Sequence, residues 1–360
     1  PAEFISSVKA ALKEFGVVIV PGAIPQQKAA SLFKSHQDFF KYLAPDLDPT
    51  DSSSWRQNVP DFSARGAGMI RGGAGNMPTS WETRVLLQPL FAEILGTNDL
   101  IPSGDAVTIR PPGPAFSKMN PGDCVDMTTD WAHVDQTIDS KMRCIQGQVI
   151  LNPSTACFVA SPRSHHIHSE LVLAVGMHGS PSNFCAFNKY DGDVPGSGPR
   201  KAREMVESAG GTWQIPMARW GENGIPEPWP PGTVILWDSR LVHSAMPPFE
   251  GDPNFRCVAY VSMRPAADYT PEALKQREDA IRLNRTTTHW GDHFFRLDDP
   301  ASLPDSVHVS PLMKQFLAQP EGVWPAVAAG RMDKDAVLPD WGRVKEVFPA
   351  LSAVVSEVSS

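Results

Sequence analysis

The chain has 360 residues, 41% of them hydrophobic and 20% charged, so it is long enough to bury a sizeable core. A formal net charge of -8 gives no electrostatic reason to expect a nucleic acid or an anionic membrane as the partner. No stretch approaches the roughly 20 consecutive apolar residues of a membrane helix. We therefore expect a cytoplasmic protein, a monomer or homodimer, whose partner is a small molecule.

The cysteines are odd in number and form no CxxC pair, which is typical of free thiols in a reducing compartment. Most of them lie in apolar segments, so we expect them to be buried. They are Cys124, Cys144, Cys157, Cys185 and Cys257.

The first hundred residues are predicted to be mainly helical. Apolar residues at helical spacing predict a helix over 2–15, and the β-branched run at 17–20 predicts a buried strand. Two further helices are expected over about 25–43 and 79–95. Residues 44–78, rich in Pro, Gly, Ser and Asp, are expected to form a long loop over the pocket.

Short strands separated by Pro and Gly turns follow. The segments that read as strands are DAVTIR, WAHVDQ, CIQGQVIL, CFVAS, TVILWD and CVAYVSM. Regular spacing of this kind predicts an all-β barrel or sandwich. An insertion at about 185–230 adds a loop and a short helix and is expected to help cover the pocket. Helix returns at Thr270-Pro271, with proline at the first helical position.

This order of elements predicts one domain of the α+β class with a mainly β core. We expect residues 1–103 to support the core, residues 104–265 to form it, and residues 266–360 to be a helical extension.

The WAHVDQ segment places His133 and Asp135 two residues apart. Alternate residues of a strand point to the same face, about 6–7 Å apart along the backbone, so this pair can share a divalent ion. His243 follows the apolar strand TVILWD and can complete the set. Two histidines and one carboxylate form the facial triad of non-heme Fe(II) oxygenases, which leaves coordination positions open.

2-Oxoglutarate can occupy two of those positions, and O2 the last. The distal carboxylate of 2-oxoglutarate would then lie inside the barrel, where leaving it unpaired costs several kcal/mol. Arg256, at the start of FRCVAYVSM, is placed to supply a bidentate partner. Arg264 is a second candidate, but it lies far along the strand and precedes a proline.

These motifs occur together with SPRSHHIH and NRTTTHW, and in this order the chain resembles the phytanoyl-CoA dioxygenase-like Fe(II)/2-oxoglutarate oxygenases of microbial and fungal type. The resemblance implies a double-stranded β-helix of the jelly-roll or cupin-like kind, flanked by N- and C-terminal helices. It implies that His133, Asp135 and His243 are the iron ligands and that Arg256 holds 2-oxoglutarate.

Other residues in the same segments are expected to support the site. Gln146 and Gln148 share a face of their strand, so one of them is a candidate donor to the co-substrate carboxylate. Ser239 and Arg240 are expected to brace the turn before the second histidine. The Arg-x-Ser pair of many such enzymes is absent, and a hydroxyl partner must come from elsewhere, with Tyr260 and Ser262 as candidates.

A second departure from the family pattern concerns the segment NPSTACFVASPRSHHIH. Cys157 and Arg163 stand where small residues or glycine are expected. Because of these two residues, the sequence does not decide the conformation of the local backbone or the route of access to the pocket.

The resemblance implies oxidation of a substrate C–H bond, by hydroxylation in the default case, with release of succinate and CO2. The carboxylate of Asp135 argues against a halogenase, which needs a small residue there to admit halide. Two alternatives stay open: a hydroxylase or demethylase of a protein or nucleic acid, and a non-catalytic β-barrel binding module.

Several aromatic and histidine side chains are expected to lie on the surface or pack in the core rather than to act in catalysis. We expect His165, His166 and His168 to be solvent-facing loop residues rather than a zinc cluster with His178. Trp131 and Trp237 are expected to pack in the core rather than to form a substrate platform. Packing is likewise the default role of His289.

Overall fold

The computed structural model describes residues 2–43, 48, 69–70, 75, 78–110, 132–138, 144–175, 185–187, 197–222, 224, 226–246, 248–249, 252–282 and 286–290. Over these residues no helix combines the length and apolarity needed to cross a membrane. Most of the predicted 44–78 loop, Cys124, Trp131, His178 and the extension after residue 290 lie outside the described residues.

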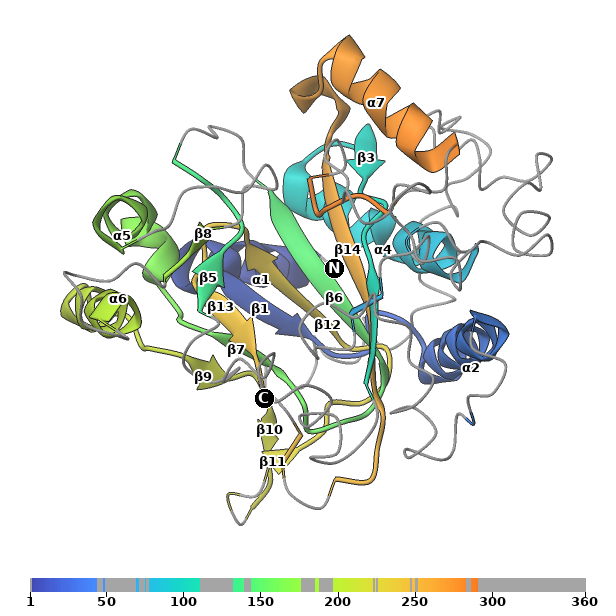
Figure 1. Cartoon of the computed structure of the whole chain (residues 1–360), viewed down its shortest axis with the longest axis horizontal. Helices are drawn as coiled ribbons and strands as arrows, with labels where there is room; N and C mark the ends of the chain where they lie inside the picture. Colours follow the sequence, from blue (N-terminus) through green and yellow to red (C-terminus); the bar gives the residue numbers. More distant parts are fainter. Residues whose placement is uncertain are drawn as a thin grey trace.

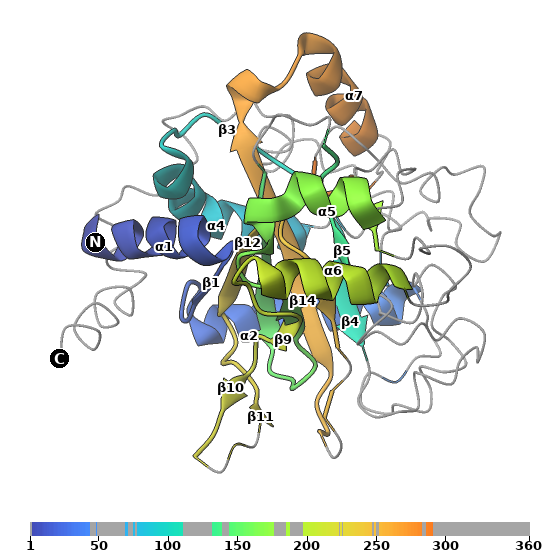
Figure 2. The same ribbon diagram turned by 90° about the vertical axis from the view of Figure 1, so that its left-hand side faces the viewer.

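Two antiparallel sheets face each other between two sets of helices (Figure 1). The outer face of the larger sheet is covered by α1 (Ala2–Phe15), α2 (Gln26–Leu43) and α4 (Pro78–Leu95), which share one apolar cluster with it. A second cluster joins the smaller sheet to α5 (His168–Val175) and α6 (Ser197–Ser208), which lie side by side in Figure 2.

The larger sheet has seven strands. Its order is β1 (Val17–Val20), β12 (Val234–Asp238), β6 (Ile145–Asn152), β14 (Arg256–Pro265), β4 (Val107–Arg110) and β2 (Met69–Ile70), with β3 (Leu100–Pro102) also paired to β14.

The smaller sheet has five strands. Its order is β8 (Cys185–Ala186), β5 (His133–Val134), β13 (His243–Ala245), β7 (Phe158–Ala160) and β9 (Ile215–Pro216). The remaining elements are the hairpin β10 (Arg219–Trp220) with β11 (Pro226–Glu227), the 3-10 turns Ser164–Ile167 and Ala266–Asp268, and α7 (Pro271–Arg282).

The chain passes back and forth between the sheets. From β4 to β7 successive strands alternate between the larger and the smaller sheet, and β12, β13 and β14 alternate again. The resulting orders β4-β14-β6-β12 and β5-β13-β7-β9 are those of a double-stranded β-helix, which is a jelly roll of eight strands. The fold class expected from the sequence is confirmed.

The polar residues of β6 show which face of the larger sheet is the inner one. Val149 and its neighbours of equal parity pack against the helices, whereas Ile150 belongs to the cluster between the sheets. Gln146 and Gln148 share the parity of Ile150 and are buried, so they point into the barrel. The interior between the two sheets is therefore partly polar.

The predicted helices and the long strands are present, and the insertion does contain a helix, α6. It lies on the outside of the smaller sheet, whereas Met217, Ala218, Glu227 and Trp229, farther along the insertion, line a cavity beside Arg256. Seven short strands were not predicted, namely β2, β3, β8, β9, β10, β11 and β13. Two or three residues carry too little periodicity to be recognised, and these strands exist because a neighbouring strand pairs with them.

Candidate metal centre

The two histidines lie on facing positions of neighbouring strands. His243 on β13 pairs with His133 on β5 and, on its other side, with Ala160 on β7. Residues paired across a ladder share a face, and Ala160 belongs to the cluster between the sheets. Both imidazoles therefore point into the barrel, with their ring centroids 4.2 Å apart.

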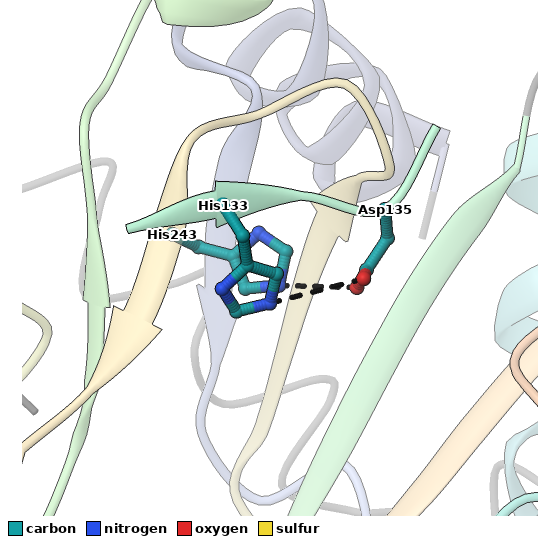
Figure 3. A group of neighbouring side chains, drawn as sticks. All are labelled: His133, Asp135 and His243. Atoms are coloured by element: carbon teal, nitrogen blue, oxygen red, sulfur yellow. Dashed lines mark ion pairs between the residues drawn. The ribbon is translucent and has the colours of Figure 1, made fainter. Parts of the chain in front are cut away.

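Asp135 lies one residue beyond the end of β5 and turns its carboxylate toward the two rings (Figure 3). His243 Nε2 is 3.1 Å from Oδ2, and His133 Nε2 is 3.8 Å from Oδ1. One ligand atom of each residue lies within 4.8 Å of the others, and among the described residues this is the one set of three or more such groups. The geometry fits a single divalent ion.

The tautomer of His243 also suits a metal ligand. Its Nδ1 lies 2.9 Å from the carbonyl oxygen of Leu241, which can only accept a hydrogen bond. Nδ1 therefore carries a proton, and Nε2 is the ring nitrogen that faces Asp135 and the position between the three residues. Phe158 and Trp237 pack beside the ring, with centroids at 5.3 and 5.5 Å.

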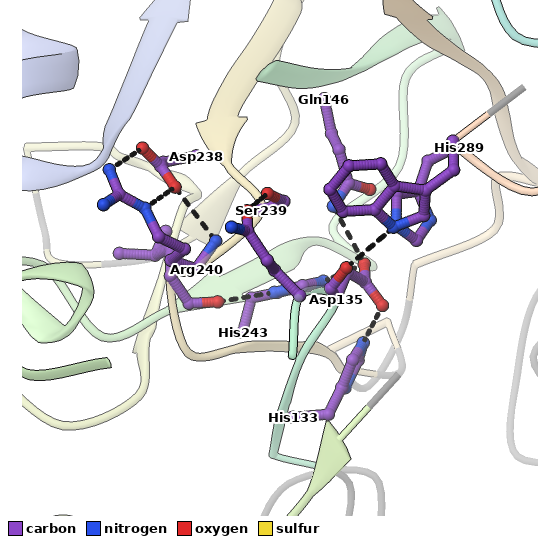
Figure 4. Close-up of polar contacts among 11 residues, drawn as sticks. His133, Asp135, Gln146, Asp238, Ser239, Arg240, His243 and His289 are labelled. Carbon is purple, nitrogen blue, oxygen red and sulfur yellow. Dashed lines mark hydrogen bonds and ion pairs between the residues drawn. The ribbon is translucent and has the colours of Figure 1, made fainter. Parts of the chain in front are cut away.

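Hydrogen bonds to β6 and to the β12–β13 turn hold Asp135 (Figure 4). Gln146 Nε2 donates to Oδ2 at 3.0 Å, and the backbone N–H of Asp135 donates to Ser239 O at 2.9 Å. Ser239 also donates its hydroxyl to the side chain of Gln136 at 2.5 Å. The turn between β12 and β13 is thereby tied to the segment that carries the other two ligands.

The carboxylate of Asp135 is ionised near neutral pH. Burial by itself raises the pKa of this group, but His289, His243 and His133 lower it by more, and the net pKa lies well below the ordinary value. An ionised carboxylate and a neutral imidazole are the forms that bind a metal.

Arg256 lies farther along the same interior. It is 6% exposed, and its one polar side-chain partner among the described residues is Gln148, whose Oε1 accepts from the guanidinium at 3.2 Å. A buried guanidinium that meets only a neutral amide favours an anionic ligand, because an unpaired charge is costly away from water. A cavity adjoins it, lined among others by Gln148, Cys157, Phe158 and Trp229.

Arg264, the other candidate for binding the ligand carboxylate, is already surrounded by aromatic side chains. Arg264 is 1% exposed, with its guanidinium carbon 4.5 Å from the ring centre of Tyr269 and 5.0 Å from that of Trp290. It donates to backbone carbonyls, including that of Trp290 at 3.5 Å. These contacts favour Arg256 for a ligand carboxylate.

The two glutamines have different contacts, although the sequence treats them as equivalent. Gln146 contacts Asp135, whereas Gln148 contacts Arg256. Tyr260 lies opposite Gln148 in the ladder and shares a 3.0 Å hydrogen bond with Thr108, while Ser262 lies opposite Gln146. Of the two hydroxyl candidates, Tyr260 is therefore nearer to the arginine.

The turn that presents His243 contains two separate polar contacts. Arg240 forms a bidentate pair with Asp238, at 2.8 and 2.7 Å, and lowers the pKa of that carboxyl against the effect of burial. Ser239 bonds to the Asp135 segment instead. The expected brace thus consists of one internal ion pair and one link between strands.

The expectation of solvent-facing histidines is wrong for two of the three. His165 and His168 are 6% and 5% exposed. The ring nitrogens of His165 and His166 lie 3.1 Å from the carbonyls of Lys13 and Glu14, so they satisfy the last turn of α1. His168 contacts the carbonyl of Gln136 at 2.6 Å. These histidines join helices to the core, which a sequence pattern does not reveal.

The cysteines and Trp237 behave as expected where they are described. Cys144, Cys157 and Cys257 are buried and free, and Trp237 packs in the interior. Burial raises the pKa of Cys157 to about 12, although Arg256 lowers it, so the thiol beside the cavity is inert.

The sequence did not predict two further hydrogen bonds to the site. The carbonyl oxygen of Asp135 accepts from His289 Nε2 and from Trp290 Nε1, both at 3.0 Å. Both residues lie in NRTTTHW, a segment quoted for the resemblance, but nothing in its pattern indicates which part of the fold it reaches.

A double-stranded β-helix with a buried His-x-Asp and a distal His on its inner face is the architecture of the non-heme iron, 2-oxoglutarate-dependent oxygenases. The fold and the three-residue set implied by the sequence resemblance are both present. No protein-family model matches the chain.

Comparison with known proteins gives distant relatives. The chain is 23% identical to the "Ava biosynthesis cluster protein O" of Aspergillus versicolor over 284 residues, which is 76% of this chain and 82% of that protein. Among solved structures, the epimerase SnoN in complex with Fe3+, alpha ketoglutarate and nogalamycin RO is 14% identical over 74% of this chain and 85% of that one, with a TM-score of 0.45. EctD from S. alaskensis with bound Fe is 14% identical over 73% and 77%, with a TM-score of 0.42.

Proposed function

We propose that this protein binds Fe(II) and 2-oxoglutarate and uses O2 to oxidise a C–H bond of a small molecule, in the simplest case by hydroxylation. The observation that carries the proposal is the buried set of His133, Asp135 and His243, whose ligand atoms converge within 4.8 Å. Two nitrogens and one carboxylate oxygen are a donor set suited to iron, and they leave room for exogenous ligands.

The placement of Arg256 supports 2-oxoglutarate as the co-substrate. Gln146 contacts the carboxylate of Asp135, and Gln148, two residues along β6, contacts Arg256. Two residues of a strand span roughly 6.6 Å, so the two glutamines leave the chain about the length of a short dicarboxylate apart, one contacting Asp135 and the other Arg256. Arg256 would hold the distal carboxylate, with Gln148 orienting the guanidinium and Tyr260 as the nearby hydroxyl.

Bound there, iron and 2-oxoglutarate would supply the oxidising chemistry, with one oxygen atom of O2 passing to the substrate and the other to succinate as CO2 leaves. The protein's part is to orient Nε2 of His243 toward the metal position through the Nδ1–H bond to Leu241, to keep Asp135 ionised, and to exclude water. Phe158 and Trp237 provide the apolar wall beside His243.

A small-molecule substrate is supported by the name of the Aspergillus versicolor relative, which places that protein in a biosynthesis cluster. Asp135 argues against halogenation, since its carboxylate occupies the position that a halide would need. A complete ligand set beside a buried arginine argues against a non-catalytic binding module.

The test is made with purified protein under anaerobic conditions. Addition of Fe(II) and 2-oxoglutarate should produce a weak visible charge-transfer band, and admission of O2 should produce succinate. The variants His133→Ala and Asp135→Ala should lose both signals. A wild-type protein that binds no iron and forms no succinate would overturn the proposal. A metabolite library analysed by mass spectrometry then identifies the oxidised substrate.

A further inference from the structure

Residues 286–290, called the strap from here on, follow α7 and return to the metal centre. Two of their side chains donate to the same atom, the carbonyl oxygen of Asp135: His289 Nε2 and Trp290 Nε1, each at 3.0 Å. Because a carbonyl oxygen only accepts, Nε2 of His289 carries its proton here. The labelled His289 lies beside Asp135 in Figure 4, on the side away from His133.

Asp135 needs such support because it lies outside the sheet. The ladder of β5 includes only His133 and Val134, so no strand pairing fixes the next residue. Its N–H instead bonds to Ser239 O, and its C=O bonds to the strap. With both peptide groups held, the two backbone dihedrals of Asp135 are held, and with them the direction in which the carboxylate leaves the chain.

The strap is itself firmly anchored. Thr287 exchanges two hydrogen bonds with Gly104, at 3.0 and 2.7 Å. The carbonyl of Trp290 accepts from the hydroxyl of Tyr269 at 2.8 Å, and the indole lies beneath the guanidinium of Arg264. Trp290 is 1% exposed and His289 is 9% exposed. Because the strap is anchored by these contacts, it can fix the position of Asp135.

We propose that His289 and Trp290 are positioning residues that aim the carboxylate of Asp135 at the metal. The inference rests on the proposed metal site and adds that the site is completed by chain beyond the β-helix. Removing the hydrogen-bond partner of a metal ligand commonly lowers metal affinity by 10- to 100-fold. Loss of the strap's donors should therefore weaken metal binding by about that factor, beyond any effect on folding.

The experiment compares two conservative tryptophan variants. Trp290→Phe keeps an aromatic ring beneath Arg264 and removes the Nε1–H donor. Trp81→Phe is the matched control, because Trp81 is also buried, at 3% exposure, and also lies beneath a guanidinium, that of Arg84 at 4.4 Å. Each protein is titrated with Co(II), whose visible spectrum reports affinity and coordination geometry, and is unfolded thermally without metal.

We expect Trp290→Phe to bind Co(II) 10- to 100-fold more weakly and with an altered spectrum, while Trp81→Phe binds as the wild type does. Equal affinity and an equal spectrum in Trp290→Phe would overturn the inference and leave the metal site standing. A wild-type protein that binds no Co(II) would overturn the metal site, and the inference with it.

A second pair of variants covers the case in which Trp290→Phe does not fold. His289→Gln retains an N–H donor on a side chain of similar reach, whereas His289→Leu does not. The glutamine variant should restore part of the Co(II) affinity that the leucine variant loses. The inference fails if both bind as weakly as each other or both bind like the wild type.

Discussion

At the scale of single residues, the contrast between Arg256 and Arg264 decides where an anion can bind. Both lie on β14 with the same parity and both are buried, but Arg264 is enclosed by Tyr269 and Trp290. Arg256 has a neutral amide as its partner and a cavity beside it. Exposure alone would not separate them, whereas the chemical identity of their neighbours does.

Replacing Arg256 by lysine should raise the KM for 2-oxoglutarate by an order of magnitude or more, because an ammonium cannot reproduce the bidentate fork. The measurement is succinate formation as a function of 2-oxoglutarate concentration. Arg203→Lys, on the exposed surface of α6, is the control and should leave the KM unchanged. An unaltered KM in Arg256→Lys would shift the role to another cation.

His36 makes stability depend on pH. The side chain is fully buried on α2, and neither ring nitrogen has a hydrogen-bond partner in the part of the chain that the structure describes. Burial, with a smaller effect of Arg84, lowers its pKa from 6.5 to about 4. His36 therefore binds a proton below pH 6.5 in the unfolded chain, whereas in the native state it does so only below about pH 4. The stability contributed above pH 6.5 is lost as the pH falls through this window, in total about 3 kcal/mol.

The check is urea unfolding at pH 7 and pH 5 of the wild type and of His36→Met, which does not titrate. Between these pH values the wild type should lose about 2 kcal/mol more of its free energy of unfolding than the variant. An identical loss in the two proteins would show that His36 is not the titrating group.

At the scale of elements, short strands were the least predictable feature of this fold. The segment WAHVDQ has the alternation of a strand of six residues, yet among its described residues, 132–136, only His133 and Val134 are paired. The chain leaves the ladder at Asp135, where its N–H finds Ser239 instead of a strand partner. Hydrophobic alternation marks which residues face inward, but it does not mark where pairing stops.

The turn before β12 depends on a glycine for two reasons. Gly232 has φ 87°, and a Cβ atom added there would lie 1.9 Å from the carbonyl oxygen of Ile24. Gly210 has φ 78° and open space around the same position. Backbone strain should destabilise Gly210→Ala by about 1–2 kcal/mol.

Gly232→Ala should cost several kcal/mol more than Gly210→Ala, because the backbone of residue 24 must also move. Denaturant unfolding of the two variants and the wild type measures the difference. Equal costs would mean that the contact with Ile24 relaxes without penalty and that only the dihedral matters.

At the scale of the whole molecule, the metal centre connects parts that are distant in the chain. Its three candidate ligands lie on β5, one residue beyond β5, and on β13. The hydrogen bonds that hold Asp135 come from β6, the β12–β13 turn and the strap. An ion that binds only the native arrangement stabilises all of them together, by about 2.7 kcal/mol when present at one hundred times its Kd.

Addition of Mn(II), which does not oxidise readily, should therefore raise the melting temperature by a few degrees, and EDTA should reverse the shift. His243→Ala, which lacks one ligand, should show no such shift. The measurement is thermal unfolding with and without metal. A shift of the same size in the variant would indicate that Mn(II) acts elsewhere on the protein.

By itself, the sequence determined the helices and long strands, the inward direction of His133, Asp135, Gln146 and Gln148, and the candidate set of metal ligands. Periodicity carries this information because it reports the face on which each side chain lies. Only the tertiary structure decided which strands pair, and hence that His243 lies opposite His133, that the two glutamines contact different partners, and that the strap reaches Asp135. These contacts join residues up to 155 positions apart, and their partners are selected by the closure of two sheets, which no local pattern encodes.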